Sequence, residues 1–575
     1  MLIHSAEERE RYRALGWWGD VRMQDLLARN AERSPEREAL VDPPNLEEIT
    51  GTPPLRLSWR ALADQVQRLA TALLELGLRR DDVVVLQMAN SHELLACYLA
   101  CARLGVIISP VVPQYREHEL AHILTQSQAS AMLVTARIGS HDHARMAAQL
   151  ANRHPQVRRV MAFGEAADLG GAIDLRAAMR QADDDARLRT HEIEHPVGAD
   201  DVLTLLWTSG SEGQAKAVPR THNDWLLYAP QIGSAYRVGD GARLLNGRPL
   251  TTHGAFVGSI TPWLFHAGTL INHHPFNLPV FLGQMRTESI DFTALAPAIL
   301  SSLLKEPALL DGVDFTRLRY IGSGSAPLTE AQVRGFHERF GVEVINFFGS
   351  TEGASLVSAP ADMPDPALRA LYFPRFGAAG FDWHHRSAAM VQTRLIDPES
   401  GEIIQDPGRT GELCYRGPMV MKGYYRAPEL SARALDAQGY YHSGDLFQIA
   451  GDQQQYYRFM GRAKDIIIRG GFNISAQEIE NLVASHPAVL EVAVVPYPDA
   501  RLGERICACV VPRPGQTLTL ASLLDHLRDE QKLAVIKLPE RLVLLDSLPR
   551  NPNNKVMKSA LRDRAMAQSD PAAPA

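Results

Sequence analysis

Residues 83–112 read VVVLQMANSHELLACYLACARLGVIISPVV, and their pattern predicts the fold class of the chain. The apolar run over residues 83–88 predicts a buried strand of a parallel sheet. A helix is predicted over residues 94–104, because Gly105 follows as a stop signal, and residues 106–112 predict the next strand. Alternation of strand, helix and strand is typical of an α/β fold in which helices flank a mostly parallel sheet.

The chain divides into a long N-terminal part and a short C-terminal part. Its 575 residues exceed the size of a single hydrophobic core. The character of the sequence changes after Gly461, where short elements predict a small α+β unit. These elements are a strand at residues 465–468, a helix at residues 476–484 and strands at residues 489–495 and 506–511. We therefore predict a large domain over residues 1–461 and a small domain over residues 462–575.

Composition excludes several classes of function. The 66 acidic and 59 basic residues give a net charge of −7, so there is no electrostatic case for a nucleic-acid partner. The five cysteines form no CxxC pairs, which argues against a zinc site. The N-terminus has no apolar signal region, and the most apolar window, residues 94–112, is interrupted by Arg103, Gly105 and Pro110. We expect a cytoplasmic protein without a membrane span. The oligomeric state stays open, a homodimer included.

Residues 203–222, LTLLWTSGSEGQAKAVPRTH, place a loop of small and hydroxyl-bearing residues directly after an apolar strand. Small residues let a ligand approach the backbone, and successive N–H groups in such a turn bind anions. The candidate phosphate-binding residues are Thr208, Ser209, Gly210, Ser211, Gly213 and Lys216. A polyphosphate fits this loop, whereas the alternative on the segment alone is a flexible turn.

The loop does not follow the GxxxxGK[ST] pattern of another phosphate-binding loop. Counted from Gly210, the second glycine position is Ala215, and Lys216 is followed by Ala217 instead of Ser or Thr. The hydroxyl that would hold Mg²⁺ in that pattern is therefore missing.

Four further stretches follow the loop in order. They are NFFGSTE at 346–352, YHSGD at 441–445, GRAKD at 461–465 and PRNPNNK at 549–555. With the loop, they resemble the motifs of the adenylate-forming superfamily, which includes acyl- and aryl-CoA synthetases, stand-alone adenylation enzymes and firefly luciferase. The loop of that family usually reads [ST]SG[ST]TGxPKG, and this chain departs from it at Glu212, Ala215 and Ala217. The resemblance extends from about residue 59 to residue 561.

This resemblance implies that the chain binds ATP and Mg²⁺. Phe348 would lie against the adenine ring, and the Thr351 hydroxyl would bind the α-phosphate. Glu352 would hold Mg²⁺, which prefers oxygen ligands. Asp445 would accept hydrogen bonds from both ribose hydroxyls, and Arg462 would also contact the ribose.

The resemblance also implies that the C-terminal part changes partners during the reaction. Lys555 would contact the reacting carboxylate and the α-phosphate, although Asn554 replaces the usual glycine. Lys464 would be the hinge between the domains. Gly470 and Gly471 would border the tunnel for the thiol, because glycines let a pantetheine arm pass close to the backbone.

The acyl side of the site is expected around two segments. Residues 322–328, GSGSAPL, resemble the family's GGAPL loop, which lines the acyl pocket and touches adenine. The candidate pocket residues are His253, Gly254, Phe256, Ser323, Gly324, Phe347 and Gly349, and Ser325 and Ala326 are expected against adenine. Dihydroxybenzoate ligases typically have Asn after the histidine, whereas Gly254 follows here. We therefore expect an aromatic, alicyclic or other bulky hydrophobic acid and no catechol acid.

The function implied is that of an ATP-dependent acid–thiol ligase. A carboxylic acid would attack ATP to give an acyl-adenylate and pyrophosphate, and the acyl group would then pass to CoA. One alternative acceptor is the phosphopantetheine of a carrier protein. An alternative of a different class is a non-catalytic nucleotide-binding relative, which the departures at Glu212, Ala215 and Asn554 motivate.

Overall fold

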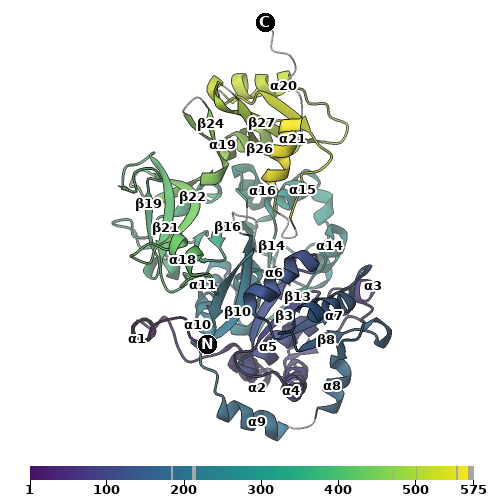
Figure 1. Cartoon of the computed structure of the whole chain (residues 1–575). Helices are drawn as coiled ribbons and strands as arrows, with labels where there is room; N and C mark the ends of the chain where they lie inside the picture. Colours follow the sequence, from purple (N-terminus) through teal and green to yellow (C-terminus); the bar gives the residue numbers. More distant parts are fainter. Residues whose placement is uncertain are drawn as a thin grey trace. The chain divides into compact units, whose positions relative to one another are not determined.

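The computed structural model (Figure 1) describes residues 1–182, 185–209, 215–324, 326–469, 472–499, 501–531, 533–551 and 555–567. Several residues singled out by the sequence lie outside this part of the chain. They are Gly210, Ser211, Glu212, Gly213, Ser325, Gly470, Gly471 and Asn554. The side chain of Ser209 is likewise not described.

The chain folds into two compact units. Unit 1 comprises Met1–Ala370, Asp382–Gln392 and Arg416–Tyr441, and unit 2 comprises Leu371–Phe381, Thr393–Tyr415 and His442–Ala575. The domain limits predicted at residues 461 and 462, and the hinge at Lys464, stay predictions.

A seven-stranded sheet of unit 1 contains the segment that predicted the fold class. The run of valines after Asp82 forms β3, which pairs in parallel with β4 and β5. Every residue of β3, β4 and β5 is buried, as expected for strands covered on both faces. The order is β11 (Ala215–Thr221), β10 (Val202–Ser209), β4 (Ile107–Val111), β3 (Val83–Gln87), β5 (Ala131–Thr135), β8 (Arg159–Phe163) and β9 (Ile173–Asp174).

An eight-stranded sheet forms the other half of unit 1. Its central strands are parallel, whereas β17 and β2 run antiparallel at the two edges. The order is β17 (Gly353–Ser358), β16 (Glu343–Ser350), β15 (Tyr320–Gly324), β14 (Phe292–Ala294), β12 (Arg243–Asn246), β13 (Thr269–Asn272), β1 (Glu38–Val41) and β2 (Arg56–Ser58).

Helices cover these sheets with apolar faces. Leu62, Val66 and Leu69 of α4 are fully buried, and α4 lies beside α5 (Figure 1). Cys97 and Cys101 are buried within α5, so they serve as core residues. The main helices of unit 1 are α2 (Met23–Arg33), α4 (Trp59–Glu75), α5 (His92–Leu104), α6 (Glu117–Ser127), α7 (His143–Arg153), α11 (Ala229–Tyr236), α14 (Leu278–Thr287), α15 (Pro297–Lys305) and α16 (Glu330–Phe340).

Shorter helices complete unit 1. They are α1 (Ala6–Ala14), α3 (Leu46–Thr50), α8 (Leu175–Gln181), α9 (Asp185–Glu194), α10 (His222–Leu226), α12 (His253–Ala255), α13 (Thr261–Phe265) and α18 (Pro428–Ala434). A π-helical turn at Phe256–Ile260 links α12 to α13.

Unit 2 contains two further sheets. The six-stranded sheet has the order β18 (Tyr372–Pro374), β23 (Tyr456–Arg462), β22 (Tyr441–Ala450), β21 (Thr410–Arg416), β19 (Gln392–Ile396) and β20 (Ile403–Ile404). The second sheet joins β25 (Phe472–Ser475), β24 (Ile466–Arg469), β27 (Gly503–Pro512), β26 (Val489–Asp499) and β28 (Arg541–Leu544). The helices α19 (Ala476–Ala484) and α21 (Lys558–Ala567) contact β26. The short helix α20 (Leu520–Asp525) completes the unit.

The predicted fold class is confirmed: parallel sheets are flanked by helices in the long N-terminal part, and α+β structure follows Gly461. Within the described residues, no helix combines the length and the apolar character needed to cross a membrane.

Candidate functional site

The hairpin of β10 and β11 holds both ends of the predicted phosphate loop. Antiparallel pairing sets Thr208 opposite Lys216 at the end of the hairpin where the predicted phosphate loop joins the two strands. The Thr208 hydroxyl donates a hydrogen bond to Glu352 Oε1 at 3.3 Å. Lys216 Nζ lies 5.1 Å from the centre of the Tyr424 ring, a distance typical of a cation–π contact. Three predicted residues, Thr208, Lys216 and Glu352, are therefore brought together.

Glu352 is a buried carboxylate held by two hydroxyl groups. Its Oε1 accepts from Thr208 and from the Tyr424 hydroxyl, the latter at 3.0 Å, and only 8% of the residue is exposed. Burial, together with the Glu352 charge, raises the pKa of Tyr424, so this hydroxyl keeps its proton and acts as a donor. Oε2 makes no hydrogen bond within the described part of the chain. An oxygen atom in this position suits a hard cation such as Mg²⁺.

The backbone beside Glu352 is fixed by Arg220. This guanidinium is fully buried at the end of β11, and it donates to the carbonyl of Thr351 at 2.5 Å and to the carbonyl of Met419. The Glu352 carbonyl accepts the Met421 N–H at 2.8 Å. Arg220 thus joins three segments that are far apart in the sequence. This role was not predicted from the sequence, although Arg220 lies within residues 203–222.

Gly353 lets this turn pack closely. It has φ +133°, and a Cβ there would lie 2.3 Å from the Met419 carbonyl oxygen. Any side chain would therefore displace the segment that carries Tyr424.

Strand β16 presents the two phenylalanines of the NFFGSTE motif in succession. Because neighbouring residues of a strand point to opposite faces, Phe347 and Phe348 cannot serve the same face. Phe347 contacts Tyr236 edge to face, with ring centres 5.5 Å apart. Phe348 is half-buried and Gly349 is exposed. The contact of Phe348 with adenine stays a prediction.

The neighbouring strand β15 is packed against Phe347. A Cβ on Gly324 would lie 2.6 Å from the Phe347 carbonyl oxygen, so glycine is required for the close approach. Ser323 is buried, and its hydroxyl donates to the Leu295 carbonyl at 2.8 Å. Its side chain is therefore engaged by the backbone. Ala326, which the sequence placed against adenine, is exposed.

His253 lies in an aromatic cluster. Its ring centre is 5.4 Å from Trp225 and 5.5 Å from Tyr228. Both ring nitrogens are buried, and neither has a hydrogen-bond partner in the structure as described. Burial, with a contribution from Arg220, lowers the pKa of His253 well below its usual value, so the ring is neutral at pH 7. Phe256 stacks on the far part of the cluster, at 4.5 Å from Trp225.

In unit 2, Asp445 and Arg462 face each other across β22 and β23. Arg462 Nε lies 2.7 Å from Asp445 Oδ1, and Nη2 lies 3.3 Å from Oδ2. Asp445 is 5% exposed, whereas Arg462 is exposed. The two residues that the resemblance assigned to the ribose are thus in direct contact.

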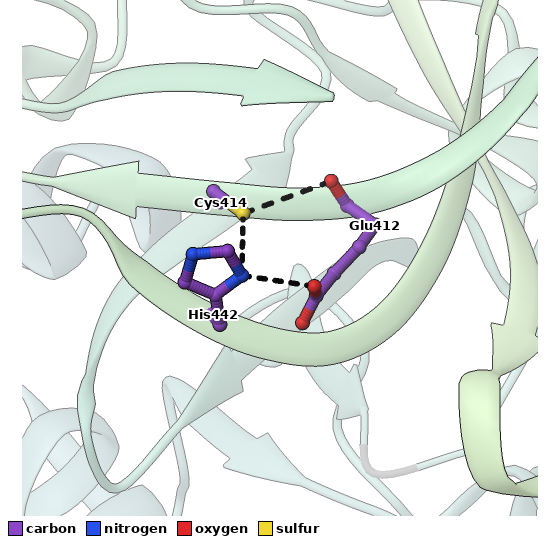
Figure 2. A group of neighbouring side chains, drawn as sticks. All are labelled: Glu412, Cys414 and His442. Atoms are coloured by element: carbon purple, nitrogen blue, oxygen red, sulfur yellow. Dashed lines mark hydrogen bonds and ion pairs between the residues drawn. The ribbon is translucent and has the colours of Figure 1, made fainter. Parts of the chain in front are cut away.

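The turn before Asp445 is braced by Glu412 of β21, which lies beside Cys414 and His442 in Figure 2. One oxygen of Glu412 accepts the Gly444 N–H at 2.8 Å, and the other lies 2.9 Å from His442 Nδ1. Cys414 Sγ is 3.4 Å from the same nitrogen. These three side chains could hold a metal ion, since their ligand atoms lie within 4.8 Å of one another. Their hydrogen bonds give them a sufficient role in positioning the Gly444–Asp445 turn.

The remaining predicted residues lie at the surface of unit 2. Lys464 is exposed, and its carbonyl accepts from Arg562 at 3.1 Å. Lys555 is also exposed, and its N–H donates to Asn551 Oδ1 at 2.9 Å while its carbonyl accepts the Asn551 N–H. These two bonds fix the backbone of Lys555 relative to Asn551.

Known proteins resemble this chain over nearly its whole length. Residues 27–425 match the family model described as AMP-binding enzyme, and residues 478–555 match the AMP-binding enzyme C-terminal domain. A medium-chain fatty-acid–CoA ligase of Escherichia coli K12 is 30% identical, with 98% of this chain and 94% of the relative covered. A 2-hydroxy-7-methoxy-5-methyl-1-naphthoate–CoA ligase of Streptomyces carzinostaticus is 31% identical, with 97% and 96% covered. The crystal structure of ATP-bound MatB from Rhodopseudomonas palustris superposes with a TM-score of 0.76 at 27% identity, covering 95% of this chain and 99% of that one.

Proposed function

The chain belongs to the AMP-binding enzyme family, and we propose that it is an ATP-dependent acid–thiol ligase that forms an acyl-adenylate and transfers the acyl group to CoA. The observation that carries the proposal is the convergence of Thr208, Lys216 and Glu352 at the end of the β10–β11 hairpin. A hydroxyl donor, a cation and a buried carboxylate are the groups needed to hold a triphosphate with its metal ion.

In the first step, a carboxylate oxygen of the substrate attacks the α-phosphorus of ATP, and pyrophosphate leaves. The protein contributes mainly positioning and charge neutralisation. Lys216 and Thr351 would bind the phosphates, and Lys555 would offset the charge where carboxylate and phosphate approach each other. Mg²⁺ held by Glu352 would neutralise phosphate oxygens when bound.

Unit 2 would contribute the ribose contacts. The Asp445 carboxylate already accepts two bonds from Arg462, and its turn is held by Glu412, so it is oriented without a ligand. Such preorganisation reduces the entropy lost on binding.

In the second step, the sulfur of a thiol attacks the acyl carbonyl, and AMP leaves. For this step we propose rotation about Lys464, which would withdraw Lys555 from the reacting atoms. The acceptor we propose is free CoA, because both curated relatives described above are named CoA ligases. A carrier-protein phosphopantetheine is the alternative acceptor.

The acid that we propose is bulky and largely hydrophobic. The segments assigned to the acyl group carry two pairs of contacting aromatic rings, which are Phe347 with Tyr236 and Phe256 with Trp225. The naphthoate named for the Streptomyces relative is of this type.

The test is pyrophosphate release by the purified protein with ATP, Mg²⁺ and a panel of carboxylic acids, with and without CoA. Release that depends on the acid and accelerates with CoA supports the proposal, whereas release without a CoA effect indicates a carrier protein. Lys555→Ala is the matched control: it should abolish release while ATP still binds. ATP binding without release for any acid would favour a non-catalytic relative.

A further inference from the structure

Arg248 is a cation that has no counter-ion among the described residues and lies beside the segment assigned to the acyl group. It follows β12, and it is half-buried. Within the described residues, its guanidinium takes part in no hydrogen bond and no ion pair. Burial lowers the pKa of this group, yet an arginine keeps its charge in proteins. The guanidinium is only partly buried and has no partner among the described residues, so it is available to bind an anionic group of a ligand.

The guanidinium lies over Gly254. A Cβ built on Gly254 would be 3.0 Å from Arg248 Nη1, so any larger residue would have to displace the guanidinium. Gly254 directly follows His253, whose ring nitrogens are also unpartnered in the described structure. The departure at Gly254 from the residue found in dihydroxybenzoate ligases therefore makes room for an arginine.

The surroundings of Arg248 are aromatic on one side and rigid at the backbone. Its carbonyl accepts from the side-chain amides of Asn90 and Asn246, each at 2.8 Å. The charge of Arg248 acts on Tyr236, whose ring stacks on Phe292 with centres 3.5 Å apart. The backbone that carries Arg248 is therefore fixed, and a guanidinium suits recognition of a planar anionic group.

The phosphate side of the site does not use Arg248. Glu352 is held by Thr208 and Tyr424, and the neighbouring carbonyls are held by Arg220. Lys216 is the cation of that side. A second cation among the acyl-side residues therefore points to a charge on the acid itself.

We propose that Arg248 binds a second carboxylate of the substrate, so that the enzyme activates one end of a dicarboxylic acid with an aromatic or other apolar middle. This inference rests on the proposed function. Arg248 forms a fork of two N–H donors that matches a carboxylate, and the rings of Tyr236 and Phe347 lie where the apolar middle would pass. The unpartnered His253 nitrogens supply a further neutral donor or acceptor.

The experiment compares acids that differ only in the second carboxylate. Pairs are terephthalate with 4-methylbenzoate and suberate with octanoate, and the readout is kcat/KM for acid-dependent pyrophosphate release. A site built for a polar group rejects analogues that lack it, so we expect the wild type to favour the diacid of at least one pair by about 100-fold or more. Arg248→Met should remove this preference and raise activity with the monoacid. Arg248→Lys should retain a part of the preference for the diacid.

Arg243→Met is the matched control, because Arg243 begins β12, the strand that Arg248 follows, and is ion-paired with Glu38 and Glu288. It should leave the acid preference unchanged and lower the melting temperature of the free protein. Arg248→Met should instead raise the melting temperature, because it removes an unpaired charge.

The outcomes separate this proposal from the function it rests on. If the wild type favours the monoacid in both pairs, the ligase stands and the role of Arg248 is wrong. If Arg248→Met lowers activity equally with every acid, Arg248 acts on the reacting centre, and the proposal is overturned. If no acid gives pyrophosphate release, the proposed function fails. A lower melting temperature for Arg248→Met would show that the residue is structural.

Discussion

Two clusters in unit 1, one around Glu352 and one around His253, differ in whether their polar groups have hydrogen-bond partners. Around Glu352, the carboxylate is bonded by Thr208 and Tyr424, and Arg220 holds the adjoining carbonyls. Around His253, both ring nitrogens and the nearby Arg248 guanidinium have no partner in the described structure. In the first cluster the carboxylate is held through Oε1 and keeps Oε2 for a cation, whereas the second cluster leaves its polar groups without partners among the described residues.

This difference matches the two tasks of an adenylate-forming enzyme. The phosphate side meets the same ATP in every turnover, so its groups can be fixed in advance at no cost in specificity. The acyl side must choose among acids, and an unpaired buried group is satisfied only by a substrate that carries the matching group. We therefore expect a substrate that carries the matching polar group to satisfy the unpartnered groups of the second cluster when it binds.

The largest effect is expected from Glu352→Gln. The amide keeps the shape and the contacts with Thr208 and Tyr424 but loses the charge, so the phosphates and their metal ion would be held less well. We expect kcat/KM for pyrophosphate release to fall about 100- to 1,000-fold, and equally for all acids. Steady-state kinetics over the acid panel measures this. A loss confined to some acids would place Glu352 on the acyl side and contradict the comparison.

Arg220→Met should have the next largest effect, on stability. It leaves the carbonyls of Thr351 and Met419 buried without their donor, which should cost about 2–4 kcal/mol of unfolding free energy. Denaturant unfolding measures this. Arg317→Met is the control, since Arg317 pairs with Asp291 at the surface and should change stability by about 0.5 kcal/mol or less. Equal losses of unfolding free energy in the two variants would show that the bonds from Arg220 to the Thr351 and Met419 carbonyls do not stabilise the fold.

Acid should destabilise unit 1 through its buried histidines. The pKa of His222 is lowered by burial to about 4, and its Nδ1 accepts the Met23 N–H. The folded protein keeps the ring neutral, whereas the unfolded chain takes up a proton below pH 6.5. The stability is therefore fully present above pH 6.5 and is lost as the pH falls from 6.5 towards 4.

Unfolding free energies at pH 7.5, 6 and 5 should fall by about 1 kcal/mol or more for each such histidine. The pKa is also lowered to about 4 at His143, His274 and His385. His222→Gln, which keeps an acceptor without a titrating ring, should reduce the slope. An unchanged slope in this variant would count against the assignment.

The smallest effect comes from a matched pair of tyrosines. Tyr424→Phe removes a donor from Glu352 and should cost about 1 kcal/mol. Tyr228→Phe removes a buried hydroxyl that has no partner in the described structure, so stability should stay equal or rise. Thermal unfolding of the two variants gives the contrast directly. If Tyr228→Phe is the more destabilising of the two variants, the Tyr228 hydroxyl makes a stabilising contact, and the contrast between the two clusters is wrong.

Much of the fold could be predicted from short stretches. The valines of β3 and the helix ending at Gly105 predicted a parallel strand and its neighbour to within a residue or two. The motif residues Thr208, Lys216 and Glu352 were predicted as a group, and the structure brings them together. Family membership confirms the reaction class that the motifs implied. The hinge at Lys464 and the contacts of Lys555 with the reacting atoms stay predictions.

The contacts of three residues could not be predicted from short stretches of the sequence. Arg220 acts on carbonyls at positions 351 and 419, Tyr424 acts on Glu352, and Arg248 lies over Gly254. Each stands outside the residues for which the family motifs imply a ligand contact. Ser323 shows the converse, because a residue inside a motif uses its hydroxyl on the backbone.

The sequence by itself determined the strands, because these depend on local apolar patterns. It also determined the order of the motifs and the prediction that the chain binds ATP, because these depend on residue types at fixed spacing. The tertiary structure decided which polar groups are satisfied. That property depends on side chains that meet across many residues of chain, such as Arg220 with Met419, and on which charged groups, such as the Arg248 guanidinium, have no partner among the described residues. The proposed selection of the acid by Arg248 and His253 rests on this tertiary arrangement.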